Sequence, residues 1–327
     1  MDLDEIFRIV QKAMQNPPLI LVGSGGSAPY GLPTMSQLAD HLKDSLGLRY
    51  QDDYYWQGFV ENLDDGQDLE TALTGINLND DILENIRIET WKLISDKDVK
   101  LFEDVILSNK ELAIGKLIKH FYQAHPKCVN VVTTNYDRVI EYACDSFDLP
   151  ICLGFEGLYA KRYNHCFKNS NCVNIVKVHG SLDLFIDTHK TTIGIPLLKE
   201  FPIGLVPEII TPGSSKYQAV LKGTIRELLH EADRMIDNAE AFLCIGYGFN
   251  DEQIQEKIIT KIQQGIPIVI ITMELSDKAT HLINEKAKHS IIIQKGDDDN
   301  TSVCINRRLY SLPGNYWSID GFVKILD

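Results

Sequence analysis

The sequence lacks any hydrophobic run long enough to cross a membrane. Its longest apolar runs, residues 241–246 and 266–273, have the length of strands, whereas a spanning helix needs about 20 apolar residues. The first residues, Met-Asp-Leu-Asp-Glu-Ile-Phe, are acidic and do not show the basic-then-apolar order of a secretory signal. We therefore expect a cytoplasmic protein with no membrane contact.

Paired cysteines are also missing. The chain has 7 cysteines, and no two of them are spaced as Cys-x-x-Cys. Structural zinc modules use such pairs, so we expect no metal site and no bound zinc. An odd number of scattered cysteines without a secretory signal favours free thiols in a reducing compartment.

Basic residues are too few to balance the acidic ones. Lys and Arg number 32 against 46 Asp and Glu, which gives a formal net charge of −14. An acidic surface repels phosphate backbones, so we expect no direct binding of nucleic acid by this chain. At 327 residues, with 44% hydrophobic and 24% charged residues, the composition is that of an ordinary globular protein.

Short apolar segments alternate with helical patterns along the chain. The expected strands are residues 19–22, 129–134, 174–178, 241–245 and 266–273, with 290–294 as a sixth. The expected helices are residues 3–15, 35–45, 137–145, 216–237, 251–264 and 276–288. This alternation predicts an α/β fold with a Rossmann-like, doubly wound parallel sheet in a single domain covering 1–327.

Two connections are longer than a crossover helix requires. Between the first two strands, helical signals at residues 80–93 and 112–122 predict a helical insertion or small subdomain over about 48–123. The proline-containing stretch 182–217 is expected to be a loop with short strands. The acidic run 297–300 is expected to be a solvated loop.

A glycine cluster directly follows the first strand. Gly23, Gly25 and Gly26 leave no side chain between the backbone N–H groups and an approaching ligand, and a helix is expected to start near Thr34. This arrangement is typical of a nucleotide pyrophosphate site. A tight turn between a strand and a helix would use the same glycines.

Polar clusters follow three further expected strands, at residues 133–137, 178–181 and 246–251. In a parallel sheet the carboxyl ends of the strands meet at one edge, so these clusters should face the glycine turn across one crevice. Taken singly, Asn135 and Asp137 could cap the following helix, and His179 beside a glycine could be a turn histidine with its hydrogen bonds satisfied.

These clusters resemble the sirtuin family in residue type, spacing and order. Residues 23–33, Gly-Ser-Gly-Gly-Ser-Ala-Pro-Tyr-Gly-Leu-Pro, are similar to the sirtuin pattern G-A-G-x-S-x-x-x-G-[IL]-P. Residues 133–137 are similar to T-Q-N-[IYF]-D, and residues 179–181 match H-G-S. The run 246–251, Gly-Tyr-Gly-Phe-Asn-Asp, resembles the SIR2-like branch of bacterial antiphage defence systems, in which the domain is typically an NAD hydrolase.

Two departures set the chain apart from protein deacetylases. Those enzymes carry a four-cysteine zinc module after the H-G-S motif, and this chain has no cysteine between Cys172 and Cys244. Where deacetylases have Asp-Phe-Arg after the Gly-Ile-Pro step, this chain has Thr34-Met35-Ser36. The aromatic side chain that shields the reactive sugar from water is therefore missing, which is compatible with hydrolysis.

The resemblance implies that NAD+ is the substrate and that its nicotinamide–ribose bond is cut to give nicotinamide and ADP-ribose. Asn135 and His179 are the expected catalytic residues. Asn135 can position water or the ribose hydroxyls, and His179 can accept a proton near neutral pH. The expected binding residues are Gly23, Ser24, Gly25 and Ser27 for the pyrophosphate, Asp137 for the nicotinamide carboxamide, and Gly246 and Tyr247 for the adenosine half.

Because uncontrolled loss of NAD+ is toxic, a role in defence implies a gated activity. We expect a homo-oligomer, a partner ATPase of the HerA type or a phage-derived activator. Two alternatives remain: an NAD-dependent protein deacylase or ADP-ribosyltransferase on the same fold, and a non-catalytic NAD or ADP-ribose sensor that acts by assembly.

Overall fold

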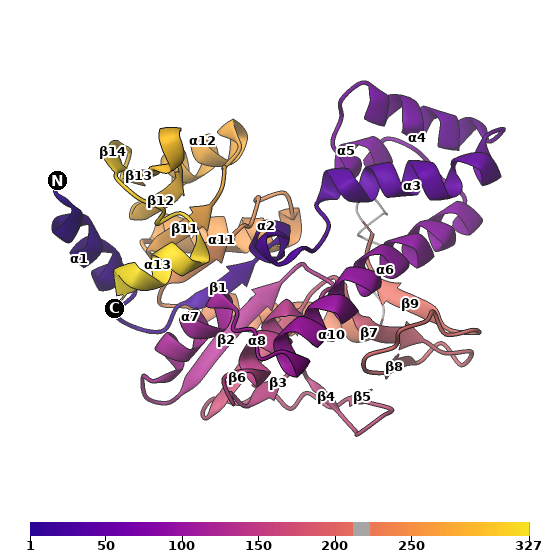
Figure 1. The fold of residues 1–327 in the computed structure, drawn as a ribbon, viewed down its shortest axis with the longest axis horizontal. Helices are drawn as coiled ribbons and strands as arrows, with labels where there is room; N and C mark the ends of the chain where they lie inside the picture. The colour runs from indigo at the N-terminus through magenta and orange to yellow at the C-terminus, as the bar shows by residue number, and fades with distance from the viewer. Residues whose placement is uncertain (212–222, 327) are drawn as a thin grey trace.

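A nine-stranded sheet forms the centre of the molecule (Figure 1), as a computed structural model describes it for residues 1–211 and 223–326. From one edge to the other, its strands are β14 (Arg308–Leu312), β13 (Thr301–Ile305), β12 (Ser290–Lys295), β11 (Ile268–Thr272), β10 (Phe242–Ile245), β1 (Leu19–Val22), β2 (Cys128–Thr133), β6 (Cys172–Lys177) and β3 (Ile151–Cys152). The strands from β12 to β3 are parallel, and the β13–β14 hairpin adds an antiparallel edge.

The sheet is doubly wound about β1, which confirms the predicted fold class. From β1 the chain proceeds to β2 and β6 on one side, and later returns to β10, β11 and β12 on the other. The direction therefore reverses between β1 and β10, where Ile20 pairs with Leu243. Ligands in open α/β sheets bind outside the carboxyl ends of the strands at such a reversal.

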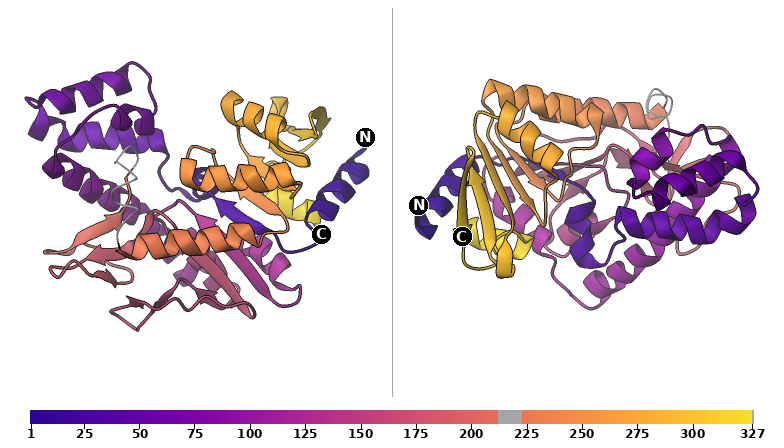
Figure 2. Two further views of the ribbon diagram at one scale, coloured as in Figure 1. Left: turned by 180° about the vertical axis from the view of Figure 1, so that it is seen from behind. Right: turned by 90° about the horizontal axis from the view of Figure 1, so that it is seen from above.

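Helices cover both faces of the sheet (Figure 2). Residues alternate between the two faces of a strand, so Ile20 and Val22 enter one core while Leu19 and Leu21 enter the other. The first face is covered by α1 (Leu3–Ala13), α7 (Ala113–Tyr122), α8 (Val139–Asp145) and α13 (Ile319–Leu326). The second is covered by α10 (Gly223–Asp237), α11 (Glu252–Gln264) and α12 (Asp277–Lys286).

A helical cluster between β1 and β2 has its own core. After the short helices α2 (Ser24–Ser27) and η1 (Ala28–Tyr30), the chain forms α3 (Met35–Tyr50), α4 (Tyr54–Asp64), α5 (Leu69–Thr74), α6 (Asp80–Phe102) and the π-helical turn η2 (Glu103–Leu107). A buried cluster that includes Trp56 and Phe59 runs from Leu38 to Ile86. The bounds expected for the insertion, 48–123, differ from those of the helical cluster. They include α7, which packs on the sheet, and they leave out most of α3, which packs in the cluster.

The long connection after β6 contains a separate three-stranded sheet, ordered β8 (Thr192–Gly194), β7 (Gly180–Ile186) and β9 (Val206–Ile209). A two-stranded hairpin, β4 (Phe155–Glu156) and β5 (Arg162–Tyr163), precedes β6. Residues 212–217 of the expected loop and 216–222 of an expected helix lie outside the described residues.

All six expected strands are present, with small shifts at their ends. The β13–β14 hairpin and the two-residue strand β3 were not predicted from the sequence. The acidic residues 297–299 form an exposed 3-10 turn, η3 (Asp297–Asp299), between β12 and β13. No helix in the two described ranges has both the length and the apolar character needed to span a membrane.

Candidate functional site

A cavity of about 290 Å³ lies at the carboxyl edge of the parallel strands. The loops that follow β1, β2, β6 and β10 form one side of it, and residues of α3, α5 and α6 form the other. Figure 1 shows the helical cluster above this edge of the sheet. The cavity lies at the reversal point of the strand order, and its volume is at the lower end of ligand pockets, which span about 300–1,000 Å³.

The glycine turn packs directly on the backbone of the loop after β10. The N–H of Gly25 donates to the carbonyl of Gly246 at 3.2 Å, and that of Gly23 donates to Ile245 at 3.1 Å. A Cβ atom on Gly246, whose φ is +54°, would lie 2.2 Å from the backbone of Gly25. These glycines are therefore required for two loops to meet, and the N–H groups predicted to face a pyrophosphate are bonded to protein carbonyls in this structure.

The candidate residues divide between the cavity wall and the layer behind it. The wall includes Gly23, Ser24, Ser27, Asn135, Asp137, His179 and Tyr247. Among the described residues, Gly25 and Gly246 do not line the cavity. They contact each other through their backbones.

Asn135 joins the second loop to the glycine turn. Its Nδ2 donates to the carbonyl of Gly23 at 3.0 Å and to Oγ of Ser27 at 2.9 Å. Among the described contacts, none donates to its Oδ1, and the residue is 8% exposed at the cavity wall. The side chain does not cap α8, so the capping alternative does not account for it.

Asp137 continues the same network. One carboxylate oxygen accepts from the N–H of Val139 at 3.2 Å, at the start of α8, and the carboxylate also accepts from Ser27. Burial raises the pKa of Asp137 from 3.8 to about 6; nearby Lys177 opposes this shift and Asp98 adds to it. Asp137 therefore both bonds the first N–H of α8 and faces the cavity.

His179 forms a buried pair with Asp251. Nε2 of His179 lies 2.5 Å from Oδ2 of Asp251, and the two side chains are 14% and 5% exposed. The other carboxylate oxygen of Asp251 accepts from the N–H of Ile254 at 3.2 Å and caps α11. A carboxylate on Nε2 favours the tautomer in which Nδ1 is unprotonated and able to accept a proton. The contact gives His179 a buried partner, which both a structural turn histidine and a catalytic base would have.

Tyr247 contributes a buried hydroxyl to the wall. The residue is 5% exposed, and its hydroxyl has no hydrogen-bond partner among the described residues. Burial, the largest cause, raises the pKa of Tyr247, so the group is a neutral donor. Because buried polar groups are nearly always paired, an unpaired hydroxyl at a cavity wall indicates a ligand contact.

The cavity is acidic. Four carboxylates line it (Asp68, Glu70, Asp137 and Asp251), and no Lys or Arg lines it within the described ranges. Asp68 and Glu70 come from the start of α5, so the helical cluster contributes charge to the site. Burial raises the pKa of Asp68 but hydrogen bonds from Thr71 outweigh it, leaving that pKa below 3.8.

The structure adds residues to those predicted from the sequence. Asp251 ends the run 246–251 and was not predicted as a site residue; its position at the start of a helix was the available signal. Behind Asp137, Arg138 forms ion pairs with Asp98 of α6 and Asp183 of β7, each at 2.5 Å. Asp98 also accepts from the backbone N–H of Arg138 at 2.7 Å. This buried network attaches α6 to the loop that carries Asn135 and Asp137.

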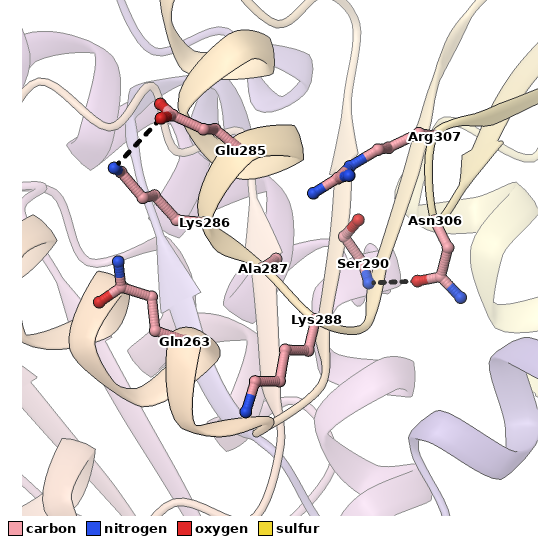
Figure 3. Close-up of a pocket in the computed structure, with 8 residues that line it drawn as sticks. All are labelled: Gln263, Glu285, Lys286, Ala287, Lys288, Ser290, Asn306 and Arg307. Carbon is pink, nitrogen blue, oxygen red and sulfur yellow. Dashed lines mark hydrogen bonds and ion pairs between the residues drawn. The ribbon is translucent and has the colours of Figure 1, made fainter.

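A second cavity, of about 640 Å³, lies at the opposite end of the strands (Figure 3). Arg307, in the β13–β14 turn, extends beside Ser290, the first residue of β12, whereas Lys288, in the loop after α12, points away from Ser290. The candidate residues all belong to the described part of the chain, and none of them lines this second cavity. In residues 1–211 and 223–326, no three His, Cys, Asp or Glu side chains are grouped to bind a metal ion.

Comparisons with known proteins agree with this architecture. A family model described as "SIR2-like domain" matches residues 129–292. A variant of a Sir2 homologue solved with ADP-ribose is 15% identical with a TM-score of 0.52, covering 100% of this chain and 96% of its own. A Sir2 homologue solved with NAD is 16% identical with a TM-score of 0.50, covering 89% of this chain and 88% of its own. The search of curated proteins found no match. At these identities the solved structures establish the fold.

Proposed function

The chain belongs to the SIR2-like domain family, and we propose that it binds NAD+ in the 290 Å³ cavity and hydrolyses the nicotinamide–ribose bond. The products would be nicotinamide, ADP-ribose and a proton. The observation that carries this proposal is the His179–Asp251 pair at 2.5 Å, on the same wall as Asn135.

Hydrolysis requires a group that accepts a proton from water. When the bond between C1′ and the nicotinamide nitrogen breaks, its electron pair goes to nicotinamide and the sugar acquires oxocarbenium character. Water adds to C1′, and its proton passes to Nδ1 of His179. Asp251 then stabilises the imidazolium, because its carboxylate lies on the other ring nitrogen. Asn135 is placed to orient the water or the ribose hydroxyls.

The acidity of the cavity supports binding of the nicotinamide–ribose end. The pyridinium of NAD+ is a cation, and cleavage transfers positive charge to the sugar. Carboxylates of Asp68, Glu70 and Asp251 would stabilise that charge before and during cleavage. A diphosphate would find no Lys or Arg on the described wall, so its donors would be hydroxyl and amide groups such as those of Ser24 and Tyr247.

We extend the proposal to a gated activity in antiphage defence. The resemblance of residues 246–251 to that branch supports it, and Asp251 of this run contacts His179. Assembly into a homo-oligomer, a partner ATPase or a phage-derived activator would supply the gate.

The test is turnover of NAD+ by the purified chain, alone and with candidate partners, with and without an acetylated peptide. We expect nicotinamide and ADP-ribose in equal amounts, independent of the peptide. His179→Ala should lower the rate by about two to four orders of magnitude, the usual contribution of a general base. The matched control is His189→Ala, an exposed histidine that does not line the cavity.

Other products would contradict this proposal in distinct ways. Acetyl transfer from the peptide to ADP-ribose would identify a deacylase. ADP-ribose attached to a protein would identify a transferase. Tight NAD+ binding with no turnover under any activating condition would identify a sensor.

A further inference from the structure

Two thiols outside the catalytic cavity are in contact. Cys152, the last residue of β3, and Cys166, in the segment between β5 and β6, have their sulfur atoms 3.0 Å apart. Both cysteines are free thiols; Cys152 is 6% exposed, and Cys166 is half-buried and accessible from the surface. Among the described residues, no sulfur–sulfur contact is seen for the other five cysteines.

The hairpin register explains why the two cysteines meet. In the antiparallel β4–β5 hairpin, the N–H of Asn164 donates to the carbonyl of Gly154 at 2.9 Å. Counted outward in the same register, Cys152 comes opposite Cys166, and both residues lie just beyond the two strands of the hairpin. Residues directly opposite each other have their Cβ atoms about 4.5–5.5 Å apart, whereas a disulfide needs about 3.5–4.5 Å, so the two cysteines must move slightly closer to form the bond.

Local packing fixes this alignment. The ring of Phe167, next to Cys166, packs so closely on Gly154 that a Cβ atom there would lie 2.8 Å from it. His165 has a φ of +40°, which turns the chain immediately before Cys166. The sulfur atoms must approach by about 1 Å to reach the 2.03–2.05 Å of a disulfide. Cys166 lies outside any helix or strand, so its side chain can make this movement.

We propose that Cys152 and Cys166 form a reversible disulfide when the protein meets an oxidised low-molecular-weight thiol such as glutathione disulfide. The thiolate of Cys166 attacks glutathione disulfide, forming a mixed disulfide and releasing one glutathione. The thiolate of Cys152 then attacks the sulfur of Cys166 and releases the second glutathione. The two protein thiols lose two electrons and two protons, and one glutathione disulfide becomes two glutathione molecules.

The order of the two steps follows from the environments of the thiols. Burial raises the pKa of Cys152 to about 12, and the adjacent Cys166 adds to the shift. Cys152 is therefore a poor first nucleophile towards an oxidant in solution. Once Cys166 carries the glutathione, the contact between the two sulfur atoms gives Cys152 a high local concentration and compensates for its weak ionisation.

The disulfide would stabilise the edge of the sheet and leave the catalytic cavity unchanged. Cys152 pairs with Asn174 in β6, and His179 comes five residues after Asn174, at most roughly 16 Å along the chain at 3.3 Å per residue. The bond would connect the edge strand β3 to the segment that leads into β6. This proposal does not depend on the proposed hydrolase function.

The test uses the full-length chain incubated with glutathione disulfide, alkylated and digested without reduction. We expect one linked peptide pair joining Cys152 to Cys166, and an increase of about 3–8 °C in melting temperature, reversed by dithiothreitol. Cys166→Ser should abolish both results. Cys304→Ser, at a partly exposed position on β13, is the matched control and should retain both.

Three outcomes would overturn the proposal. Mass spectrometry could find Cys166 linked to Cys128 or Cys172 instead, or carrying a stable glutathione adduct with Cys152 still free. It could also find all seven thiols unmodified in protein shown to be folded by circular dichroism.

Discussion

Replacing Asp251 with asparagine is expected to slow NAD+ cleavage about 10²–10⁴-fold without unfolding the protein. Oδ2 of Asp251 lies 2.5 Å from Nε2 of His179, and both side chains are largely buried. An asparagine cannot stabilise the imidazolium, and its amide N–H₂ would favour the tautomer with the proton on Nδ1. At 1.36 kcal/mol for each tenfold change in rate, the loss corresponds to about 3–5 kcal/mol of transition-state stabilisation.

The second role of Asp251 must be separated from the first. Its Oδ1 accepts from the N–H of Ile254 at 3.2 Å and caps α11. Asparagine caps helices as well as aspartate, so Asp251→Asn should keep the wild-type melting temperature, whereas Asp251→Ala should lose about 1 kcal/mol of stability in addition. Ser276→Ala removes the equivalent cap of α12, where Oγ accepts from Ala279 at 3.2 Å, and should leave cleavage unchanged.

The assay is single-turnover release of nicotinamide at saturating NAD+, with the melting temperature measured on the same preparation. A slow but fully stable Asp251→Asn variant is the expected result. Cleavage within about threefold of the wild-type rate would show that Asp251 only caps a helix. The proposed mechanism, in which Asp251 supports His179 as the base, would then be refuted.

Three further predictions follow from the buried polar groups. Asn135→Ala should lower kcat at least about 100-fold and raise KM less, because Nδ2 also fastens the glycine turn; equal effects on kcat and KM would indicate a role in binding alone. Asp137→Asn should raise the free energy of unfolding by up to about 3 kcal/mol at pH 8 and by almost nothing near pH 4, measured by urea denaturation. The reason is that folding raises the pKa of Asp137 from 3.8 to about 6, so the wild-type protein loses stability as the pH rises from 3.8 through 6, and the asparagine variant does not. A difference in stability that does not change with pH would contradict this pKa shift. Asp98→Ala should cost about 3–5 kcal/mol of stability by leaving a buried cation with one partner fewer, whereas exposed Asp96→Ala on the same helix should change it by less than about 0.5 kcal/mol.

The central strands could be predicted because parallel strands are buried on both faces. All four residues of β1 are buried, so Leu19–Val22 forms a continuous apolar run. The missed β13 is different, since its buried residues alternate with partly exposed ones and it pairs with β14, whose residues are mostly exposed. A two-residue strand such as β3 is too short for any periodicity to identify.

The position of the site could be predicted for a related reason. The carboxyl ends of parallel strands share one edge, so residues that follow β2 and β6, including Asn135 and His179, had to lie near the glycine turn. The pairing of His179 with Asp251 depends on side-chain orientation, which strand order does not determine. The carboxylates of Asp68 and Glu70 reach the cavity only because α5 docks over it, and no local pattern indicates where an insertion docks.

Access of water to the cavity depends on the same insertion. Thr34 caps α3 through a capping box with Gln37, so the residue after it begins a helix at the cavity wall. That residue is Met35, which lines the cavity and is 44% exposed. In the deacetylases that the chain resembles, this segment carries an aromatic side chain that shields the sugar. In the proposed NAD+ complex, the partly exposed Met35 would leave the sugar open to water, and His179 would be the base for that water. Under this proposal, the two walls would favour water over a bound peptide as the acceptor, and therefore hydrolysis over acyl transfer.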